Sequence, residues 1–163
     1  MKRTIYLKFL LGYAIFGVFS YLLIATYVPD MLTRYFVHEE SSSLYKEAVL
    51  IADTYASKLY TSEISLETVK EQLNALTVFL DADIWILNPS GRMVLDSAHP
   101  VDVEEIQIVE GFDPAGVAGN YYVIGNFFDY FDTTKLSVMA PIISNYQING
   151  YVVIHSDYTS ILD

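Results

Sequence analysis

The sequence predicts an α+β domain attached to one membrane-spanning helix. Three observations lead to this fold class. Residues 9–28 contain no charged side chain, residues 44–80 place apolar side chains at helical spacing, and residues 83–156 hold five short apolar runs. Helices followed by a series of strands are typical of α+β domains, in which helices cover one face of an antiparallel sheet. We therefore expect a five-stranded antiparallel sheet with a long N-terminal helix, preceded by one transmembrane helix.

The uncharged run at 9–28 has the length of a membrane span. At about 1.5 Å per residue, a 20-residue helix covers roughly 30 Å, the thickness of the hydrocarbon core of a bilayer. A cleaved secretory signal peptide is the alternative. Its apolar stretch is normally about 7 to 15 residues long and ends at a small-x-small site. The run is longer than that, and Ala25-Thr26-Tyr27 is a poor cleavage site, so an uncleaved anchor is the favoured interpretation.

The charges around this run predict its orientation in the cell membrane. Lys2, Arg3 and Lys8 precede the run, and Asp30 is the first charged residue after it. Basic flanks stay in the cytoplasm. Residues 1–8 are therefore expected to form a cytoplasmic tail, and residues 30–163 an extracellular domain.

The composition of the outer part excludes several classes of function. It contains six basic residues against all 20 acidic ones, which gives a formal charge of −14. Such a domain repels nucleic acid and anionic lipid head groups. The favoured explanation is that the negative charge keeps an exposed domain soluble. The alternative is that the acidic residues bind divalent cations. The chain has no cysteine, so disulfides, zinc–thiolate sites and thiol nucleophiles are excluded, and its 14 tyrosines and 9 phenylalanines must supply the core.

Two helices are expected before the sheet. Pro29 with Asp30 predicts a kink or break near the membrane surface. A stalk or first helix then spans 29–60, with an apolar stripe at Leu44, Ala48, Ile51, Tyr55 and Leu59. Ser65 is a suitable N-cap for the second helix, whose buried side holds Leu66, Val69, Leu73, Leu76 and Leu80.

The strands begin at Asp83. Residues 83–87 and 92–96 flank Asn88-Pro89-Ser90-Gly91, whose residue types fit a type I turn, so a hairpin is predicted. A short helix is expected around 103–109. Three further strands are expected at 120–128, 135–142 and 148–156, and Gly150 indicates a bulge in the last.

Two segments carry a resemblance to a known family. The segment at 82–97 reads ADIWILNPSGRMVLDS, and the segment at 139–156 reads MAPIISNYQINGYVVIHS. Their order resembles the extracytoplasmic PAS-like sensor domain, called CACHE or PDC, of bacterial membrane-bound histidine kinases. The N-terminal segments KFLLGYAIFG and SLYKEAVLIADTYASKLY are similar to the anchor and first helix of such kinases. The resemblance covers nearly the whole chain, with residues 61–163 completing the sensor.

The resemblance implies a function that these residues do not carry alone. A family member would continue past Asp163 into a second membrane helix and a cytoplasmic kinase of a two-component system, and it would work as a homodimer. The alternatives are a single-pass membrane-anchored binding or adaptor protein, and the sensor of a chemotaxis or cyclic-dinucleotide receptor. No catalytic residues, phosphate loop or cofactor motif are found, so the fragment is not expected to be an enzyme or to hold a cofactor.

The resemblance also implies where a small anionic or amino-acid-like ligand would bind. In the family, ligands lie where the sheet meets the segment between the second and third strands. The corresponding positions are Arg92, His99, Tyr122, Asn126 and Lys135. Surface ion pairing is the alternative role for Arg92 and Lys135.

Other polar and aromatic residues are given structural roles. His155 is expected to be structural or exposed, and Tyr55, Trp85 and Phe127 to belong to the core. Asp81 with Asp83, and Asp129 with Asp132, are assigned to turns and caps in preference to a cation site, and no metal ligands are predicted.

Overall fold

The computed structural model describes residues 2–61, 63–99 and 107–159. The chain divides into two compact units, residues 1–38 and residues 39–163. The first helix, α1, runs from Lys2 to Ile51 and contributes to both units. The predicted boundary between the membrane helix and the extracellular domain, at residues 28–30, stays a prediction.

In the first unit, α1 continues through Pro29, so the expected break is wrong. A proline removes one backbone donor and costs about 3 kcal/mol within a helix, and the turns on either side of Pro29 keep the helix intact. Among the described helices, α1 alone is long and apolar enough to cross a membrane, with a mean hydropathy of 2.0 over its most apolar window. Its large apolar side chains from Ile5 to Val28 are exposed within the chain, as a lipid-facing helix requires.

In the second unit, the predicted helical stripe is confirmed only in its first half. Leu44, Ala48 and Ile51 are buried, whereas Tyr55 and Leu59 are half-buried. A π-helical turn, η1 (Ala52–Ala56), follows α1 and leads into the short α2 (Ser57–Tyr60). A π turn takes one more residue than an α turn, so it rotates the buried side of the helix. The two alanines at the ends of η1 are buried in place of the tyrosine.

The second helix of the domain, α3, spans Leu66–Leu80 and starts where predicted. The Ser65 side chain caps it by accepting a hydrogen bond of 3.2 Å from the Thr68 amide. Val69 and Leu73 are its buried residues. The helix ends at Asp81, which adopts a left-handed conformation with φ of 50°. This residue turns the chain from the helix into the sheet.

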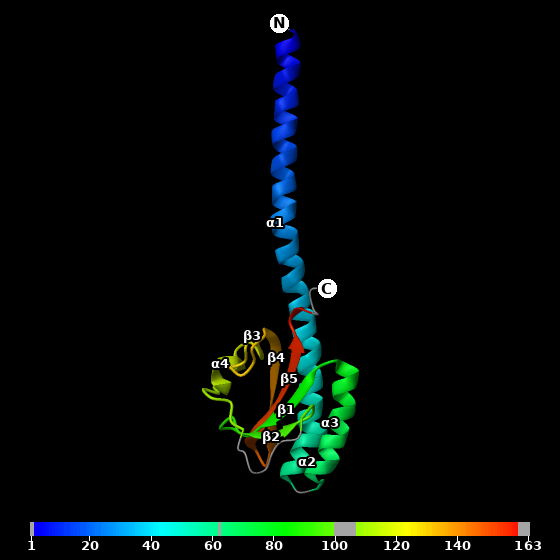
Figure 1. The fold of residues 1–163 in the computed structure, drawn as a ribbon, viewed down its shortest axis with the longest axis vertical. Helices are drawn as coiled ribbons and strands as arrows, with labels where there is room; N and C mark the ends of the chain where they lie inside the picture. The colour runs from blue at the N-terminus through cyan, green and yellow to red at the C-terminus, as the bar shows by residue number, and fades with distance from the viewer. Residues whose placement is uncertain (1, 62, 100–106, 160–163) are drawn as a thin grey trace. The chain divides into compact units, whose positions relative to one another are not determined.

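The domain holds one five-stranded antiparallel sheet with the order β2-β1-β5-β4-β3 (Figure 1). The predicted PAS-like α+β architecture is therefore confirmed. The strands are β1 (Asp83–Leu87), β2 (Met93–Asp96), β3 (Tyr122–Gly125), β4 (Lys135–Ser144) and β5 (Gln147–Asp157).

The predicted hairpin joins β1 to β2 and closes as its sequence requires. The Asn88 side-chain carbonyl accepts hydrogen bonds from the amides of Ser90 and Arg92, at 3.0 and 2.9 Å. Gly91 has φ of +81° and donates its amide to the Asn88 carbonyl at 3.0 Å. Glycine is needed here because this conformation strains residues with a Cβ atom.

Two boundary predictions between β2 and β4 need correction. The third strand is four residues long, because residues 126–130 form a turn in place of the strand expected to Phe128. Residues 103–106 of the predicted helix lie outside the described part of the chain. Residues 107–109 are not helical, since Ile108 forms an isolated bridge with Arg92. The helix in this segment is α4 (Pro114–Ala118), which is capped by Asp113.

The bulge predicted at Gly150 is confirmed beside that residue. Ile142 pairs with Gly150 and Ile143 with Ile148, so Asn149 is the extra residue of β5. A Cβ atom at Gly150 would collide with the Leu87 carbonyl oxygen and lie 2.9 Å from the Tyr60 hydroxyl. The close approach of β5 to the end of β1 therefore requires glycine.

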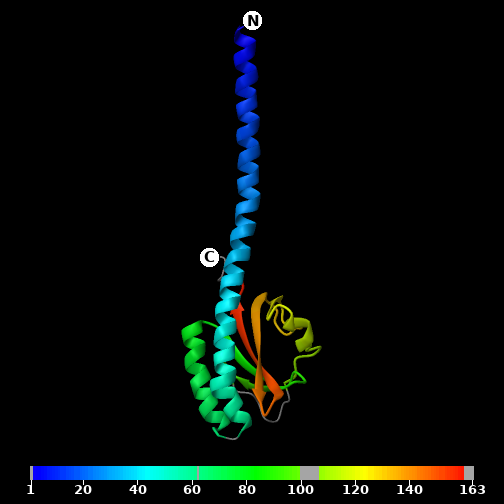
Figure 2. The same cartoon turned by 180° about the vertical axis from the view of Figure 1, so that it is seen from behind.

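The two faces of the sheet pack against different segments of this unit. The domain part of α1, together with η1 and α3, covers one face, here called the helix face (Figure 2). It buries the side chains of Ile84, Ile86, Val138, Val152 and Ile154. Because side chains alternate along a strand, Trp85, Met139 and Val153 point to the opposite face. This second face, here called the open face, packs against residues 107–131, a segment that includes α4.

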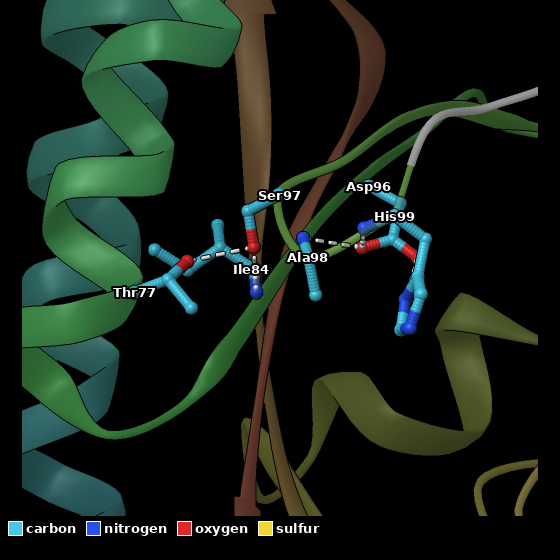
Figure 3. A network of polar contacts seen from close by, with 6 residues as sticks. All are labelled: Thr77, Ile84, Asp96, Ser97, Ala98 and His99. Carbon is cyan, nitrogen blue, oxygen red and sulfur yellow. Dashed lines mark hydrogen bonds and ion pairs between the residues drawn. The ribbon is translucent and has the colours of Figure 1, made fainter.

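A polar network at the end of β2 ties α3 to the sheet (Figure 3). Thr77 of α3 donates its hydroxyl to Ser97 at 2.7 Å, and Ser97 in turn accepts the Ile84 amide at 2.9 Å. Beside it, Asp96 is buried and accepts the Ala98 amide at 2.8 Å and the His99 amide at 3.2 Å. This Asp-Ser pair therefore fixes both the end of β2 and the C-terminal turn of α3.

Candidate ligand-binding site

The centre of the open face is filled by side chains of the domain itself. Trp85 is 3% exposed and its ring lies 4.7 Å from that of Tyr130, 5.1 Å from that of Phe131 and 6.1 Å from that of Phe127. Trp85 and Phe127 thus belong to the core, as predicted. This aromatic packing leaves the edges of the face as the places where a ligand can bind.

A left-handed turn puts these aromatic side chains in place. Phe127, Phe128 and Asp129 have φ values of 45°, 55° and 59°, a conformation that costs energy for residues other than glycine. The Asn126 amide group donates to Asp129 at 2.6 Å and supports the turn. Phe127 is 2% exposed, so its burial against Trp85 offsets the strain.

A hollow of about 350 Å³ lies at one edge of the open face, and we call it the tyrosine groove. It lies where β4 extends past the end of β3, which pairs with β4 only as far as Val138. The Tyr45 and Tyr121 rings meet there at 4.8 Å, and the Met139 amide donates to the Tyr121 carbonyl at 3.0 Å. The lining residues are Tyr45, Pro114, Ala115, Tyr121, Met139, Pro141, Ile148 and Tyr151.

The lining of the tyrosine groove suits a small molecule with an apolar body. Its volume lies within the range of about 300 to 1,000 Å³ that is usual for ligand pockets. The three tyrosines offer aromatic faces and hydroxyl groups that donate or accept hydrogen bonds. Pro141 has no amide hydrogen, which makes this edge of β4 a poor template for an added strand. A compact ligand therefore fits the groove better than an extended peptide.

A second hollow, of about 400 Å³, lies at the end of the sheet where α3 leads into β1, and we call it the acidic hollow. The Lys135 ammonium is 2.9 Å from an Asp157 carboxylate oxygen and 5.5 Å from the centre of the Phe131 ring. The residues that line it are Thr77, Val78, Asp81, Ala82, Asp83, Lys135, His155 and Asp157.

Two titratable groups of the acidic hollow are perturbed. Burial raises the pKa of the Asp83 carboxyl, and the positive charge of Lys135 opposes this in part. His155 is 1% exposed, and its Nδ1 lies 2.7 Å from the Ser137 hydroxyl. Burial, with a smaller contribution from Lys135, lowers the pKa of His155 to about 3. The imidazole is therefore neutral at physiological pH.

The structure does not bring the five predicted ligand residues together. Tyr122 pairs with Val138 and so lies on the helix face, whereas Lys135 lies on the open face. Arg92 and Asn126 are exposed, and Asn126 is engaged with Asp129. His99 contacts Asp96 through Nδ1 at 3.2 Å. Of the five, only Lys135 lines one of the two hollows, and whether any of them binds a ligand stays a prediction.

The residues that line the tyrosine groove were missed at the sequence level. Tyr45 lies on the first helix, Tyr121 precedes the third strand, and Tyr151 is in the fifth strand. Their only signal is the abundance of tyrosine, because no local pattern shows that three distant residues meet. Among the described residues, no three His, Asp or Glu side chains are arranged so that together they could hold a metal ion.

Comparison with known proteins identifies the fold. No protein-family profile matches the sequence, and no curated protein matches it significantly. Several solved structures match the fold. The sensor domain of the V. cholerae histidine kinase DctB aligns with a TM-score of 0.64 and 15% identity, covering 88% of this chain and 58% of that structure. The sensory domain of the Campylobacter jejuni chemoreceptor Tlp3, with isoleucine bound, aligns with a TM-score of 0.58 and 13% identity. The alignment covers 90% of this chain and 64% of that structure.

These similarities define the class of fold. The chain has the fold of extracytoplasmic PDC/CACHE-like sensor domains, as its sequence resemblance predicted. It spans roughly three-fifths of the length of the two structures, 58% and 64% respectively. At this level of identity the similarity concerns the fold alone.

Proposed function

We propose that this chain is the signal-sensing portion of a membrane receptor, with residues 9–28 in the membrane and the domain outside the cell. The observation that carries this proposal is the fold, which matches sensor domains of a histidine kinase and of a chemoreceptor. The uncharged run in α1 and the acidic domain that follows it support the same arrangement.

The output that we propose is a histidine kinase of a two-component system. Its catalytic domains would follow a second membrane helix beyond Asp163. Because the fold is shared with a chemoreceptor, chemotaxis output is the second candidate. The reading frame downstream of Asp163 distinguishes the two, since a kinase requires a phosphoacceptor histidine and an ATP-binding domain. A stop codon there would leave the single-pass binding protein as the remaining candidate.

We propose the tyrosine groove as the ligand site of this receptor. The chemoreceptor Tlp3 has been crystallised with isoleucine and with L-valine, molecules with a small apolar body and two charged groups. A ligand of this kind fits the size and apolar lining of the groove. It would contact Tyr45, which lies on the same helix as residues 9–28. Binding would thereby favour one of two packings of this helix against the sheet and pass the signal toward the membrane.

We also propose a homodimer as the working unit. The apolar stripe from Leu44 to Leu59 can pack on the domain's own sheet, supply a dimer face, or share both roles. Leu44, Ala48 and Ile51 are 3%, 0% and 1% exposed within one chain. The stripe is therefore used within the domain, and a dimer would form through other surfaces of the molecule.

Replacing Ile148 by aspartate is expected to abolish ligand binding in the tyrosine groove. Ile148 lines the groove and is 50% exposed, so the substitution adds a charge to the lining with little effect on folding. Apolar amino acids and small carboxylates are screened by thermal shift with the full chain in detergent. A ligand present at 100 times its dissociation constant adds about 2.7 kcal/mol of stability.

Tyr146→Asp is the matched control, because Tyr146 is fully exposed in the same hairpin and does not line the groove. This variant should keep the whole shift. A shift that survives in Ile148→Asp would place the ligand elsewhere on the domain.

The proposed orientation predicts that Tyr146→Cys is labelled on intact cells. The native chain contains no cysteine, so this is its only thiol, and the side chain at this position is fully exposed. A membrane-impermeant maleimide should therefore react with whole cells expressing the variant. Labelling that appears only after the cells are broken would show that the domain lies inside the cell. The native chain, which has no cysteine, gives the background labelling.

A further inference from the structure

The π turn η1, which joins α1 to α2, is held by a side chain as well as by the backbone. The Ser57 amide donates to the Ala52 carbonyl, whereas in an α-helix it would donate to the Asp53 carbonyl. The Ser57 hydroxyl donates to the Asp53 carbonyl at 2.7 Å and so takes the place of that amide. The conformation of this turn therefore depends on one hydroxyl group.

The π turn decides which side chains of the following helix face the sheet. Because the turn contains one extra residue, Ala56 takes the place that Tyr55 would occupy in a continuous α-helix. One turn further on, Tyr60 takes the place of Leu59 in the same way. Ala56 is 0% exposed and the Tyr60 hydroxyl is buried, whereas Tyr55 and Leu59 are only half-buried.

This arrangement buries a polar atom that has no partner. The Tyr60 hydroxyl lies beside Gly150 of β5, since a Cβ atom on that glycine would be 2.9 Å from it. No group in the described part of the chain forms a hydrogen bond with this hydroxyl. A buried polar group without a partner is unfavourable. A helix register that returned the Tyr60 hydroxyl to solvent would remove this cost.

The sequence provides such a second register. Tyr55 and Leu59 continue the helical spacing of Leu44, Ala48 and Ile51, so a continuous α-helix would also present an apolar stripe to the sheet. The first three of these residues are fully buried and would keep their places in both registers. The two registers therefore differ only from η1 onward.

We propose that η1 is a joint with two registers, the π register of this structure and an α register that buries Tyr55 and Leu59. In the α register the Ser57 amide donates to Asp53, and α2 turns relative to α1 by about 100° and shifts by about 1.5 Å. Only the role of this joint in signalling rests on the proposed function. Tyr45 of the tyrosine groove lies on the helix that enters the joint, so occupancy of the groove would bias the register.

Labelling of single thiols tests the joint, because the native chain contains no cysteine. Ala52→Cys and Ala56→Cys each place one thiol at a buried position, 1% and 0% exposed in the native chain. The first position packs with α1 and stays buried in both registers. The second reaches the surface only in the α register. Both variants are labelled as full chains in detergent micelles, with a water-soluble maleimide under native conditions.

Ser57→Ala should raise the labelling rate of the Ala56→Cys thiol by about 2- to 10-fold, because the lost hydrogen bond disfavours the π register. The Ala52→Cys thiol should keep its rate. Tyr60→Phe should lower the rate of the Ala56→Cys thiol, because removal of the unpaired hydroxyl favours the π register. Ser43→Ala, at an exposed serine of α1 outside the joint, is the matched control and should change neither rate.

Equal rates for the Ala56→Cys thiol with and without Ser57→Ala would overturn the proposal. An equal increase at Ala52→Cys would do the same, since local unfolding of the turn exposes both thiols together. If circular dichroism shows that Ala56→Cys does not fold, Leu59→Cys replaces it. That half-buried position becomes buried in the α register, so Ser57→Ala should slow its labelling, and an unchanged or faster rate would contradict the joint.

These measurements use no ligand. Their outcome is therefore independent of whether the tyrosine groove binds one, and of which output domain the receptor carries.

Discussion

Replacing Trp85 by alanine is expected to lower the free energy of unfolding of the domain by about 3 to 5 kcal/mol. The Trp85 side chain fills the centre of the open face and is 3% exposed. Its ring contacts those of Phe131 at 5.1 Å, Tyr130 at 4.7 Å and His155 at 4.2 Å. Alanine would remove all three contacts and leave a cavity that neighbouring rings refill only in part. Domains of this size are stable by only about 5 to 15 kcal/mol, so much of the stability would be lost.

Urea unfolding followed by near-ultraviolet circular dichroism measures this loss, because the tyrosines report on the core after the tryptophan is gone. Trp85→Phe keeps an aromatic ring in the same place and should lose a smaller part of the stability. Tyr146→Ala, at a fully exposed aromatic position, is the control and should lie within about 0.5 kcal/mol of the native chain. Equal midpoints for Trp85→Ala and Tyr146→Ala would show that the open face is not a packed core.

The predictions that are confirmed rest on local chemistry. Asn88 and Gly91 define a turn through their own side chain and backbone, and Ser65 caps a helix three residues from its partner. Such signals act over four residues, so they do not depend on the rest of the fold. The bulge beside Gly150 differs in its cause: the glycine is visible in the sequence, but the Leu87 carbonyl that requires it belongs to another strand.

Two of the predictions that are wrong concern elements whose shape depends on tertiary packing. The π turn at Ala52–Ala56 buries small alanines against the sheet, although the helical spacing favoured Tyr55. Phe127 and Phe128 have the composition of a strand but adopt left-handed conformations, because this turn puts Phe127 against Trp85. Local preference is outweighed in both places by burial of apolar surface.

The candidate sites also combine features that the sequence reveals with features that only the tertiary structure reveals. Lys135 stands out in the sequence because positive charges are rare in the outer part, and the structure does place it in a hollow. Its surroundings come from three strands and a helix end, and no spacing in the sequence reveals that they are acidic. The tyrosine groove is likewise assembled from residues as distant as Tyr45 and Tyr151. Charge in the sequence therefore identified one residue, and only the fold identified its neighbours.

Acidification is expected to destabilise the domain through His155. Its imidazole is fully buried and neutral, and its pKa is lowered from an ordinary value of 6.5 to about 3. Between these two values the unfolded chain binds a proton that the folded domain does not, so stability falls as the pH falls below about 6.5. At 1.36 kcal/mol per pH unit, the loss is roughly 2 kcal/mol from pH 7 to pH 5, and roughly 4 kcal/mol by pH 3. Asp83, whose pKa is raised by burial, acts in the opposite sense at lower pH.

Urea unfolding of the full chain in detergent at pH 7 and at pH 5 measures this dependence. His155→Asn removes the titrating group and should reduce the drop by roughly 2 kcal/mol. Ser137→Ala removes only the hydrogen bond to Nδ1, so it should lower stability at both pH values and keep the drop, since the ring stays buried. The comparison separates burial of the imidazole from its hydrogen bond as the cause. If His155→Asn retained the full drop, the acid sensitivity would belong to other groups, and the imidazole of His155 would have to reach solvent or a partner in the folded state.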